Sequence, residues 1–500
     1  MKKIIYVLAF ILGISLPAWA KDYPNSIDQF DGKRIAVLTS SVTNEFLLKR
    51  LPKAEPVEFN STADKLEALN SGRVDVVMEN IATLREVVRL NPGRYILFDE
   101  LISVSATAPA VKKSDVELAG KIDRIIKNMW ADGTIKKLDD KWFGNDESQK
   151  RIDIVLQPTN GTLRLGTFPQ MSPLSFVKDG KVVGYDVEIM YIVAKELGMG
   201  LEISTMDFPA LVPALVSNRV NIITGSIMVT PERSEQVLFV EGTYRGGMAL
   251  MNKATAVVEG VRVNDKGFIA GLKESLYKNF VFEDRYKLFV QGLISTIVIV
   301  VGAAFCGTIL AFIVCLSRRS NIFWLRYLAM LYIRLVQGTP IVVLLMIFYY
   351  IIFARTELSS ISIAIIAFSI NFAAYVSEML RTAIDAVDIG QIEAAKALGF
   401  NTRRVYLKIV LPQALRYVLP IYKGELIAML KMTSVVGYIA IQDLTKVSDI
   451  VRARTYEAFF PIIITAVMYF LLAYIFIVLL DYLERCVDPK RRKRCLEFSK

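Results

Sequence analysis

The chain has 500 residues, of which 53% are hydrophobic and 22% are charged, and its mean hydropathy is +0.41. At roughly 150 residues per domain, several domains are expected, one part in a membrane and one part in water. The sequence contains no histidine, which excludes Ser-His-Asp and Cys-His catalysis, HExxH zinc sites and histidine pH switches. All 4 cysteines follow residue 300, so a disulfide framework is not expected. The net charge is +11, and the basic residues lie beside apolar segments, which indicates membrane topology rather than nucleic-acid binding.

Residues 1–20 are predicted to be a secretory signal peptide. Two lysines precede an apolar run over residues 4–16, and Ala18 and Ala20 supply the small residues of a cleavage site. The alternative is an uncleaved anchor helix, but the run is shorter than the roughly 20 residues that span a bilayer. The mature chain is therefore expected to begin near Lys21, outside the cytoplasmic membrane.

Residues 21–253 alternate short β-branched runs with amphipathic helical patterns, which indicates an α/β fold with mainly parallel strands. An internal repeat is present, because residues 68–77 (ALNSGRVDVV) match residues 214–223 (ALVSNRVNII). We therefore predict two lobes of one design, over residues 21–150 and 151–253. Open α/β sheets bind ligands at the carboxyl ends of their strands, so a ligand is expected between the lobes.

Specific motifs give this region a resemblance to a known family. Residues 161–253 contain LRLGT, SFVKDGKVVGYDVEI and TGSIMVTPER, and resemble the first lobe of the polar amino acid binding proteins of ABC importers. Residues 31–144 contain DGKRIAVLTSS and ADGTIKKLDDKWFG, and resemble the second lobe. The order of the lobes is the reverse of the usual one. The resemblance implies one permuted two-lobed domain or, alternatively, two partial domains that are each completed by a partner chain.

A bound amino acid needs a cation for its carboxylate and an anion for its ammonium group. The resemblance implies that Arg233, in the Thr-Pro-Glu-Arg turn, binds the carboxylate, since its planar fork suits a bidentate contact. Glu79 falls where the family usually has the aspartate that receives the ammonium group. Ser41 matches a hydroxyl residue at a helix N-terminus. The alternative interpretations are a solvated surface charge and an ordinary helix cap.

The rest of the implied pocket departs from the family's pattern. Phe208 matches the aromatic wall, and Ser226 lies in the turn after the strand at 221–225. Met171 stands where a tyrosine is common, and Met228 stands where a hydroxyl residue is common. The pocket therefore loses hydrogen-bonding groups, which is consistent with an unusual ligand, with weak binding or with drift of the lobe pair. No residue pattern selects among amino acids.

Residues 254–284 are predicted to form an amphipathic linker, because Phe268, Leu272, Leu276 and Phe280 recur every four residues. Residues 285–486 follow as an all-α membrane domain with about five spans. Lysine and arginine accumulate in alternate loops, which places those loops and the basic tail, residues 487–500, in the cytosol. The predicted spans are 288–316, 341–354, 361–380, 418–441 and 459–483.

The cytosolic loop after the third span, residues 390–412, carries the most specific motif. A short helix of alanine and leucine that stops at a glycine suits docking as a rigid knob into a cytosolic partner. The spacing of EAA, three residues, G, nine residues and IxLP resembles the EAA loop of ABC importer permeases. The alternative is an incidental loop helix. The matching residues include Glu393, Ala394, Ala395, Gly399, Leu411 and Pro412.

Polar residues inside the predicted spans are candidates for the translocation path. A charge at such a position costs about 2.5 to 3.5 kcal/mol on the insertion scale, so it should face a neighbour or a water-filled route. A structural ion pair or a side chain that reaches the interface is the alternative. The candidates are Glu425, Lys431, Asn371 and Glu378.

The sequence contains no GxxxxGK[ST], so ATP hydrolysis is expected on a separate ABC ATPase subunit that carries ATP and Mg. No catalytic residue, metal site or cofactor is predicted in this chain, which is expected to be a transporter subunit and not an enzyme. The resemblances imply a periplasmic-binding-protein-like domain followed by a type I ABC importer permease, for polar amino acids of the glutamine, glutamate, arginine and histidine class.

The expected partners are the ATPase at the EAA loop, a second copy of the chain, an amino acid and membrane lipid, without nucleic acid. The chain is expected to be located in the bacterial cytoplasmic (inner) membrane, with the binding domain on the extracytoplasmic side. A membrane receptor and a ligand-gated channel are the alternatives. A receptor would need an output domain, for which the tail after Leu483 is too short, and a channel would insert its pore between lobe segments.

Overall fold

The computed structural model describes residues 26–39, 43–254, 268–457 and 459–487. The predicted signal peptide, Ser41 and nearly all of the basic tail therefore lie outside the described residues. The chain divides into two compact units, each of which is described by itself. The smaller unit comprises Met1–Asn60, Lys65–Val104 and Gly246–Val258, and the larger comprises Ser61–Asp64, Ser105–Arg245 and Glu259–Lys500.

The smaller unit contains a 5-stranded sheet in the order β2-β1-β3-β13-β4. Strands β1, β2 and β3 are parallel, and β13 pairs antiparallel with β3. Strand β3 is buried along its whole length, as expected for an apolar strand covered on both faces. The elements are η1 (Ile27–Phe30), β1 (Arg34–Leu38), α2 (Thr43–Arg50), β2 (Glu55–Phe59), α3 (Thr62–Asn70), β3 (Val76–Asn80), α4 (Ile81–Leu90), β4 (Tyr95–Thr107) and β13 (Tyr244–Lys253).

The larger unit begins with a second α/β lobe, whose 5-stranded sheet has the order β10-β6-β11-β5-β12. Strands β10, β6 and β11 are parallel, whereas β5 and β12 are antiparallel. Residues on both sides of position 150 build its core, in which Trp142 and Tyr185 are fully buried. The elements are β5 (Ala110–Lys112), α5 (Val116–Ala131), α6 (Thr134–Phe143), β6 (Thr162–Thr167), β7 (Gln170–Met171), β8 (Ser175–Lys178), β9 (Lys181–Val183), α7 (Tyr185–Glu196), β10 (Gly200–Thr205), η2 (Phe208–Ala210), α8 (Leu211–Val216), β11 (Ile222–Thr224), α9 (Pro231–Ser234) and β12 (Val237–Phe239).

The internal sequence repeat forms the same helix-to-strand turn in both sheets. The backbone N–H of Arg73 donates to the carbonyl of Ala68 at 2.8 Å, and that of Arg219 donates to Ala214 at 2.9 Å. Each turn contains a left-handed residue, with φ of 75° at Gly72 and 62° at Asn218. The prediction of an α/β fold is therefore confirmed.

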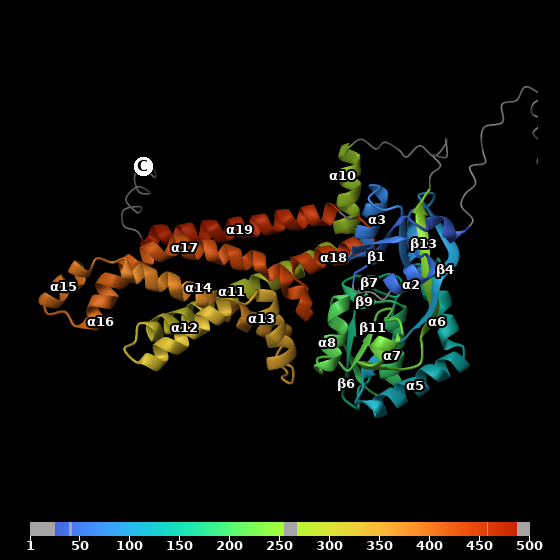
Figure 1. Ribbon diagram of the computed structural model, residues 1–500, viewed down its shortest axis with the longest axis horizontal. Coiled ribbons are helices and arrows are strands. Elements are labelled where there is room, and N and C mark those ends of the chain that lie inside the picture. Colours follow the sequence, from blue (N-terminus) through green and yellow to red (C-terminus); the bar gives the residue numbers. More distant parts are fainter. Residues whose placement is uncertain (1–25, 40–42, 255–267, 458, 488–500) are drawn as a thin grey trace, which may run out of the picture. The chain divides into compact units, whose positions relative to one another are not determined.

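The membrane domain follows the linker helix α10 (Phe268–Leu276) and consists of helices. Figure 1 shows α11, α14, α17 and α19 side by side in this part of the larger unit. The elements are the π-helix η3 (Tyr277–Val281), η4 (Phe282–Asp284), α11 (Tyr286–Arg318), α12 (Phe323–Gln337), α13 (Ile341–Ile347), the π-helix η5 (Phe348–Ile352), α14 (Ser360–Asp385), α15 (Ile389–Ala397), α16 (Thr402–Val405), the π-helix η6 (Tyr406–Val410), α17 (Leu411–Met432), η7 (Thr433–Ile439), α18 (Leu444–Thr455) and α19 (Phe460–Val487).

Among the described residues, 3 helices are long and apolar enough to cross a membrane, namely α11, α14 and α19. The count rises to 5 if each of 2 bent helix pairs forms one span, which agrees with the predicted number. The pair Phe323–Gln337 and Ile341–Ile352 bends by 108°, and the pair Thr402–Ile439 and Leu444–Thr455 bends by 55°. The first bend falls at Gly338-Thr-Pro340, where the proline ring cannot continue the preceding helix.

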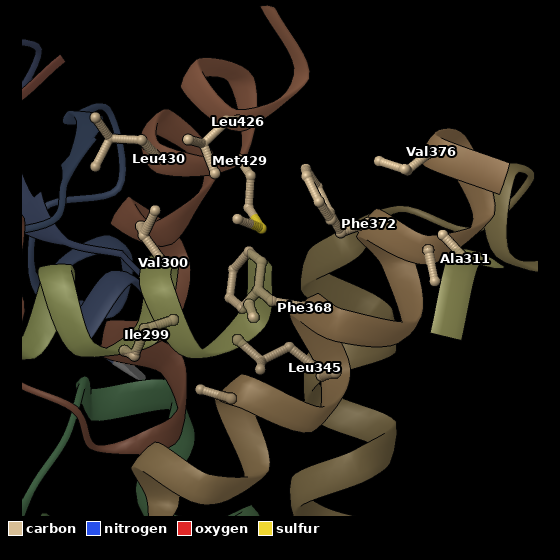
Figure 2. Packing of buried hydrophobic residues seen from close by; sticks show 14 of the residues in the cluster. Ile299, Val300, Ala311, Leu345, Phe368, Phe372, Val376, Leu426, Met429 and Leu430 are labelled. Carbon is tan, nitrogen blue, oxygen red and sulfur yellow. The ribbon is translucent and has the colours of Figure 1, made fainter. Parts of the chain in front are cut away.

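The membrane domain has one large apolar core. Figure 2 shows Phe368 and Phe372 of α14 close to Met429 of α17, with residues of α11 and α13 around them. A Cβ added at Gly307 of α11 would lie 3.0 Å from the ring of Phe372 and 3.0 Å from the carbonyl of Ser369. The glycine therefore lets α11 and α14 approach closely, as small residues do between membrane helices.

Candidate functional site

Arg233 presents a positive charge in the α/β lobe of the larger unit. Its helix, α9, is capped by Thr230, whose hydroxyl accepts the backbone N–H of Arg233 at 3.3 Å. The guanidinium carbon lies 5.2 Å from the centroid of the Phe208 ring, and Nη1 donates to the carbonyl of Met228 at 3.2 Å. Burial lowers the pKa of Arg233 below its ordinary value, but an arginine stays protonated at neutral pH. Within the described part of the chain, no carboxylate forms an ion pair with this guanidinium.

The other predicted pocket residues of this lobe are near one apolar cluster, against which Phe208 packs. Phe208 meets Phe168 edge to face at 6.0 Å, and it packs against the apolar cluster that contains Met171. Ser226, which follows strand β11, is buried beside Ile227 of that cluster. The lobe thus gathers an unpaired cation, an aromatic wall and a methionine, an arrangement that suits an anionic group on a partly apolar ligand.

Asp186 is a residue of this site that we did not single out from the sequence. It lies in the first turn of α7 and is 2% exposed, and it accepts the backbone N–H of Ser226 at 2.9 Å. Ser226 has a φ of 57°, a left-handed conformation that is strained for a residue with a side chain. Asp186 therefore holds this turn in place. Its only sequence signal is its position within the family-like segment GYDVEI.

Asp186 is expected to make the lobe less stable as the pH rises. Burial raises its pKa from 3.8 to about 6, so between these pH values the folded state binds more protons than the unfolded state. The contribution of this group to the free energy of unfolding then falls by about 3 kcal/mol in total between about pH 3 and pH 7, and it stays level above that range. Asp186→Asn removes this dependence while it keeps one acceptor oxygen. The melting temperature of the variant minus that of the wild type should rise from pH 4 to pH 7, and a constant difference would contradict the prediction.

Glu79 is paired within the smaller unit. It lies in strand β3, and its carboxylate forms an ion pair with Lys65 of α3. The two side chains are 3% and 0% exposed. Lys65 Nζ also donates to the carbonyl of Met78 at 3.1 Å, and Glu79 Oε1 accepts the backbone N–H of Asn80 at 3.0 Å. A ligand ammonium group at Glu79 would have to share this carboxylate with Lys65. The pair is not evident from the sequence, because it joins a helix to a strand through a tertiary contact.

The Lys65–Glu79 pair yields a stability prediction. Lys65→Met keeps the bulk of the side chain but leaves Glu79 as a buried charge. The free energy of opening of strand β3, as measured by hydrogen exchange, should therefore fall by about 3–5 kcal/mol. The double variant Lys65→Met with Glu79→Gln removes both charges and should recover most of that loss. Hydrogen exchange of the β3 amides in the full chain measures both effects. Equal exchange in the single and double variants would show that the pair has no such role.

The EAA segment forms a helical knob on the membrane domain. Helix α15 is capped by Asp388, which accepts the N–H of Gly390 at 2.8 Å, and it ends before Gly399 with its φ of 85°. Ala395 is buried in a small cluster with Val387, Val405 and Val410, whereas Glu393 and Ala394 are exposed. Leu411 and Pro412 are partly buried at the start of α17.

The surface of this knob is apolar as well as charged. Ile389 is 69% exposed and Leu398 is 78% exposed, beside Glu393 and Lys396. Figure 1 shows α15 and α16 at one end of the helical bundle and α18 toward the other end. Exposed apolar side chains on a helix at the tip of a membrane domain are typical of a protein interface.

The four candidates for the translocation path have different environments. Glu378 pairs with Arg318 and, at 3.2 Å, with Arg381, so its charge is compensated within the domain. Asn371 is 5% exposed, Glu425 is half-buried and Lys431 is exposed.

Two family models match the chain. The model described as "Binding-protein-dependent transport system inner membrane component" matches residues 303–489. The model described as "Bacterial extracellular solute-binding proteins, family 3" matches residues 42–145. The first match covers the helical bundle with its knob, and the second covers most of the smaller unit together with β5, α5 and α6.

Curated relatives match the membrane domain over nearly their whole length. The probable amino-acid ABC transporter permease protein YckA of Bacillus subtilis is 32% identical over 42% of this chain and 94% of its own. The histidine/lysine/arginine/ornithine transport system permease protein HisM of Salmonella typhimurium is 31% identical over 42% of this chain and 94% of its own. The putative glutamine transport system permease protein GlnP of Rickettsia bellii is 33% identical over 42% of this chain and 95% of its own. A solved amino acid ABC transporter with histidines is 33% identical over 44% of this chain and 98% of its own, with a TM-score of 0.38.

Proposed function

Since the chain belongs to the family of binding-protein-dependent transport system inner membrane components, we propose that it is the receptor and permease of an ATP-driven importer of polar amino acids. It is an amino acid ABC transporter permease with a fused solute-binding domain, and it is a multi-pass membrane protein. The membrane receptor and the ligand-gated channel are not favoured, because neither accounts for the permease family or for the EAA knob.

The observation that carries the proposed coupling to ATP is the geometry of α15. Its buried side, at Ala395, fixes the helix to the domain, while its exposed side offers Glu393, Ile389 and Leu398 to a partner. A rigid helix held in this way can transmit a movement of a cytosolic ATPase to α14 and α17, which precede and follow it in the chain. The ATPase is a separate subunit that binds ATP and Mg, and this chain supplies the docking helix.

Two copies of the chain are proposed to form the transport unit around a twofold axis. A domain with 3 to 5 spans offers too few helices to enclose a route for an amino acid by itself. Each copy then docks one ATPase. The excess of lysine and arginine near the knob supports a cytosolic position for it, and we propose that the solute-binding domain lies on the extracytoplasmic side of the inner membrane.

The ligand is proposed to be a polar amino acid whose carboxylate binds Arg233. The support is the guanidinium, which has no carboxylate partner among the described residues and is held between the Phe208 ring and the Met228 carbonyl. The relatives are named for glutamine and for histidine, lysine, arginine and ornithine, which favours the same class of cargo here. Ligand binding outside and ATP binding inside would alternately open the route to the two sides of the membrane.

Purification of the tagged full chain from bacterial membranes tests the coupling. We expect an ABC ATPase to co-purify with two copies of the chain, and its ATP hydrolysis to increase when a polar amino acid is added. A chain that purifies without any ATP-binding subunit, from membranes in which it is folded and abundant, would contradict the proposal.

A further inference from the structure

Arg219 joins the α/β lobe of the larger unit to the membrane domain. Its Nε and Nη2 both donate to the carbonyl of Tyr349 at 3.1 Å, and Nη1 donates to Thr356 at 3.3 Å. Nη2 also donates to the carbonyl of Phe353, and the guanidinium lies 4.4 Å from the Tyr349 ring. These carbonyls lie at and just beyond the C-terminal end of η5, where helical carbonyls lack partners and a cation is stabilising. One side chain of the lobe thus caps the broken second span.

A second contact lies next to the proposed ligand site. Asp207, which immediately precedes Phe208, forms an ion pair with Lys446 of α18, and the Lys446 side chain is 3% exposed. Beside it, Gln442 Nε2 donates to Thr205 Oγ1 at 3.0 Å. A buried ammonium group is stable only while its carboxylate partner stays in place. Separation of the lobe from α18 would therefore break a compensated charge pair.

A third contact is apolar. Val177 of strand β8 is 5% exposed and belongs to one cluster with Leu288 and Phe289 of α11 and Leu444 and Val447 of α18. Contacts of this kind resemble the interior of a domain, and they distinguish permanent interfaces from transient, hydrated ones.

The same region contains a buried charge cluster. Arg454 lies 4.6 Å from the Phe176 ring and binds Glu283 at 3.1 Å, and Glu283 also pairs with Arg285. Glu283 has a φ of 57°, so the linker is held in a strained conformation at this joint. The cluster ties the linker, the end of α18 and the hairpin of the lobe to one another.

We propose that the outer surface of the membrane domain is a permanent docking surface for this lobe, which stays bound throughout the transport cycle. The inference rests on the proposed function and adds to it. The receptor therefore does not dock and leave with each turnover. The Asp207–Lys446 contact then connects the ligand wall at Phe208 directly to α18.

A cross-link between the lobe and α18 tests this proposal. In the full chain, the four native cysteines are replaced by serine, and Thr205→Cys and Gln442→Cys are introduced at the 3.0 Å contact. A short, reducible thiol cross-linker then joins the two positions in proteoliposomes that contain the ATPase. We expect amino acid uptake after cross-linking to stay within about twofold of uptake before it. If the lobe is bound in every state of the cycle, a covalent link between the lobe and α18 does not change the population of any state. Loss of uptake that returns on reduction would overturn the proposal.

The rate of cross-linking provides a readout that does not depend on transport. The rate should be the same, within about twofold, without ligand, with ligand and with ATP trapped on the ATPase, because the docked fraction does not change. A decrease of more than about tenfold in any one state would show that the lobe leaves the membrane domain. The two single-cysteine chains, treated with the same reagent, control for modification alone. If the untreated chain takes up no amino acid, the proposed function fails, while the rates still decide whether docking is permanent.

Discussion

Arg233→Ala is expected to weaken amino acid binding by the full chain by at least tenfold. The guanidinium is the cation of the proposed site. Its loss removes a charge-assisted contact with the ligand worth about 1.5 to 3 kcal/mol, which weakens the affinity by roughly 10-fold to 150-fold. Stability should change little, because the side chain makes no ion pair among the described residues. Calorimetric titration of the purified chain with each of the twenty amino acids measures the effect.

Arg245→Ala is the matched control for this experiment. Arg245 also lies over an aromatic ring in the larger unit, at 5.1 Å from the centroid of Trp130, but it is exposed and it is not part of the proposed pocket. The control should bind ligand as the wild type does. Equal binding by the wild type, Arg233→Ala and Arg245→Ala would remove Arg233 from the site.

Glu393→Lys is expected to separate the chain from its ATPase. Glu393 is exposed on α15, and lysine favours a helix about as strongly as glutamate, so the knob should remain folded. The reversed charge, however, lies on the face of α15 that is proposed to dock the ATPase. Repulsion from a like charge on the ATPase, or loss of an oppositely charged partner there, costs several kcal/mol of binding free energy. Co-purification of the ATPase should fall by more than about tenfold, while amino acid binding is unchanged.

The control for this variant makes the same change of charge away from the knob. Glu357→Lys alters an exposed residue in the loop between η5 and α14, which lies on the opposite side of the membrane in the proposed topology. It should leave the ATPase bound. Normal ATPase association in Glu393→Lys would mean that the exposed face of α15 is not the docking surface.

Much of the fold was predictable because its sequence signals are local. The repeat at residues 68–77 and 214–223 identified two turns with the same hydrogen bonds, since a left-handed residue must join each helix to its buried strand. The apolar runs identified the spans, and EAA with its glycine identified α15. The 108° bend at Gly338-Thr-Pro340 was only partly predictable, because proline indicates a break but not its direction.

The site was predictable only in part, because its remaining residues act through tertiary contacts. Arg233 and Phe208, which are both predicted to bind the ligand, are in contact with each other. No pattern along the chain links Lys65 to Glu79, or Asp186 to Ser226, since each pair joins separate elements of a sheet lobe. Arg219 occupies an ordinary position in the repeat, and only the fold shows that its side chain caps η5.

Uptake of amino acids into proteoliposomes tests the central claim most directly. The vesicles contain the full chain and the ATPase that co-purifies with it, with ATP on the ATPase side and no separate binding protein. We predict ATP-dependent accumulation of at least one polar amino acid, which disappears with Arg233→Ala and with Glu393→Lys. Accumulation that requires an added binding protein, or ATP hydrolysis without uptake of any of the twenty amino acids, would contradict the account.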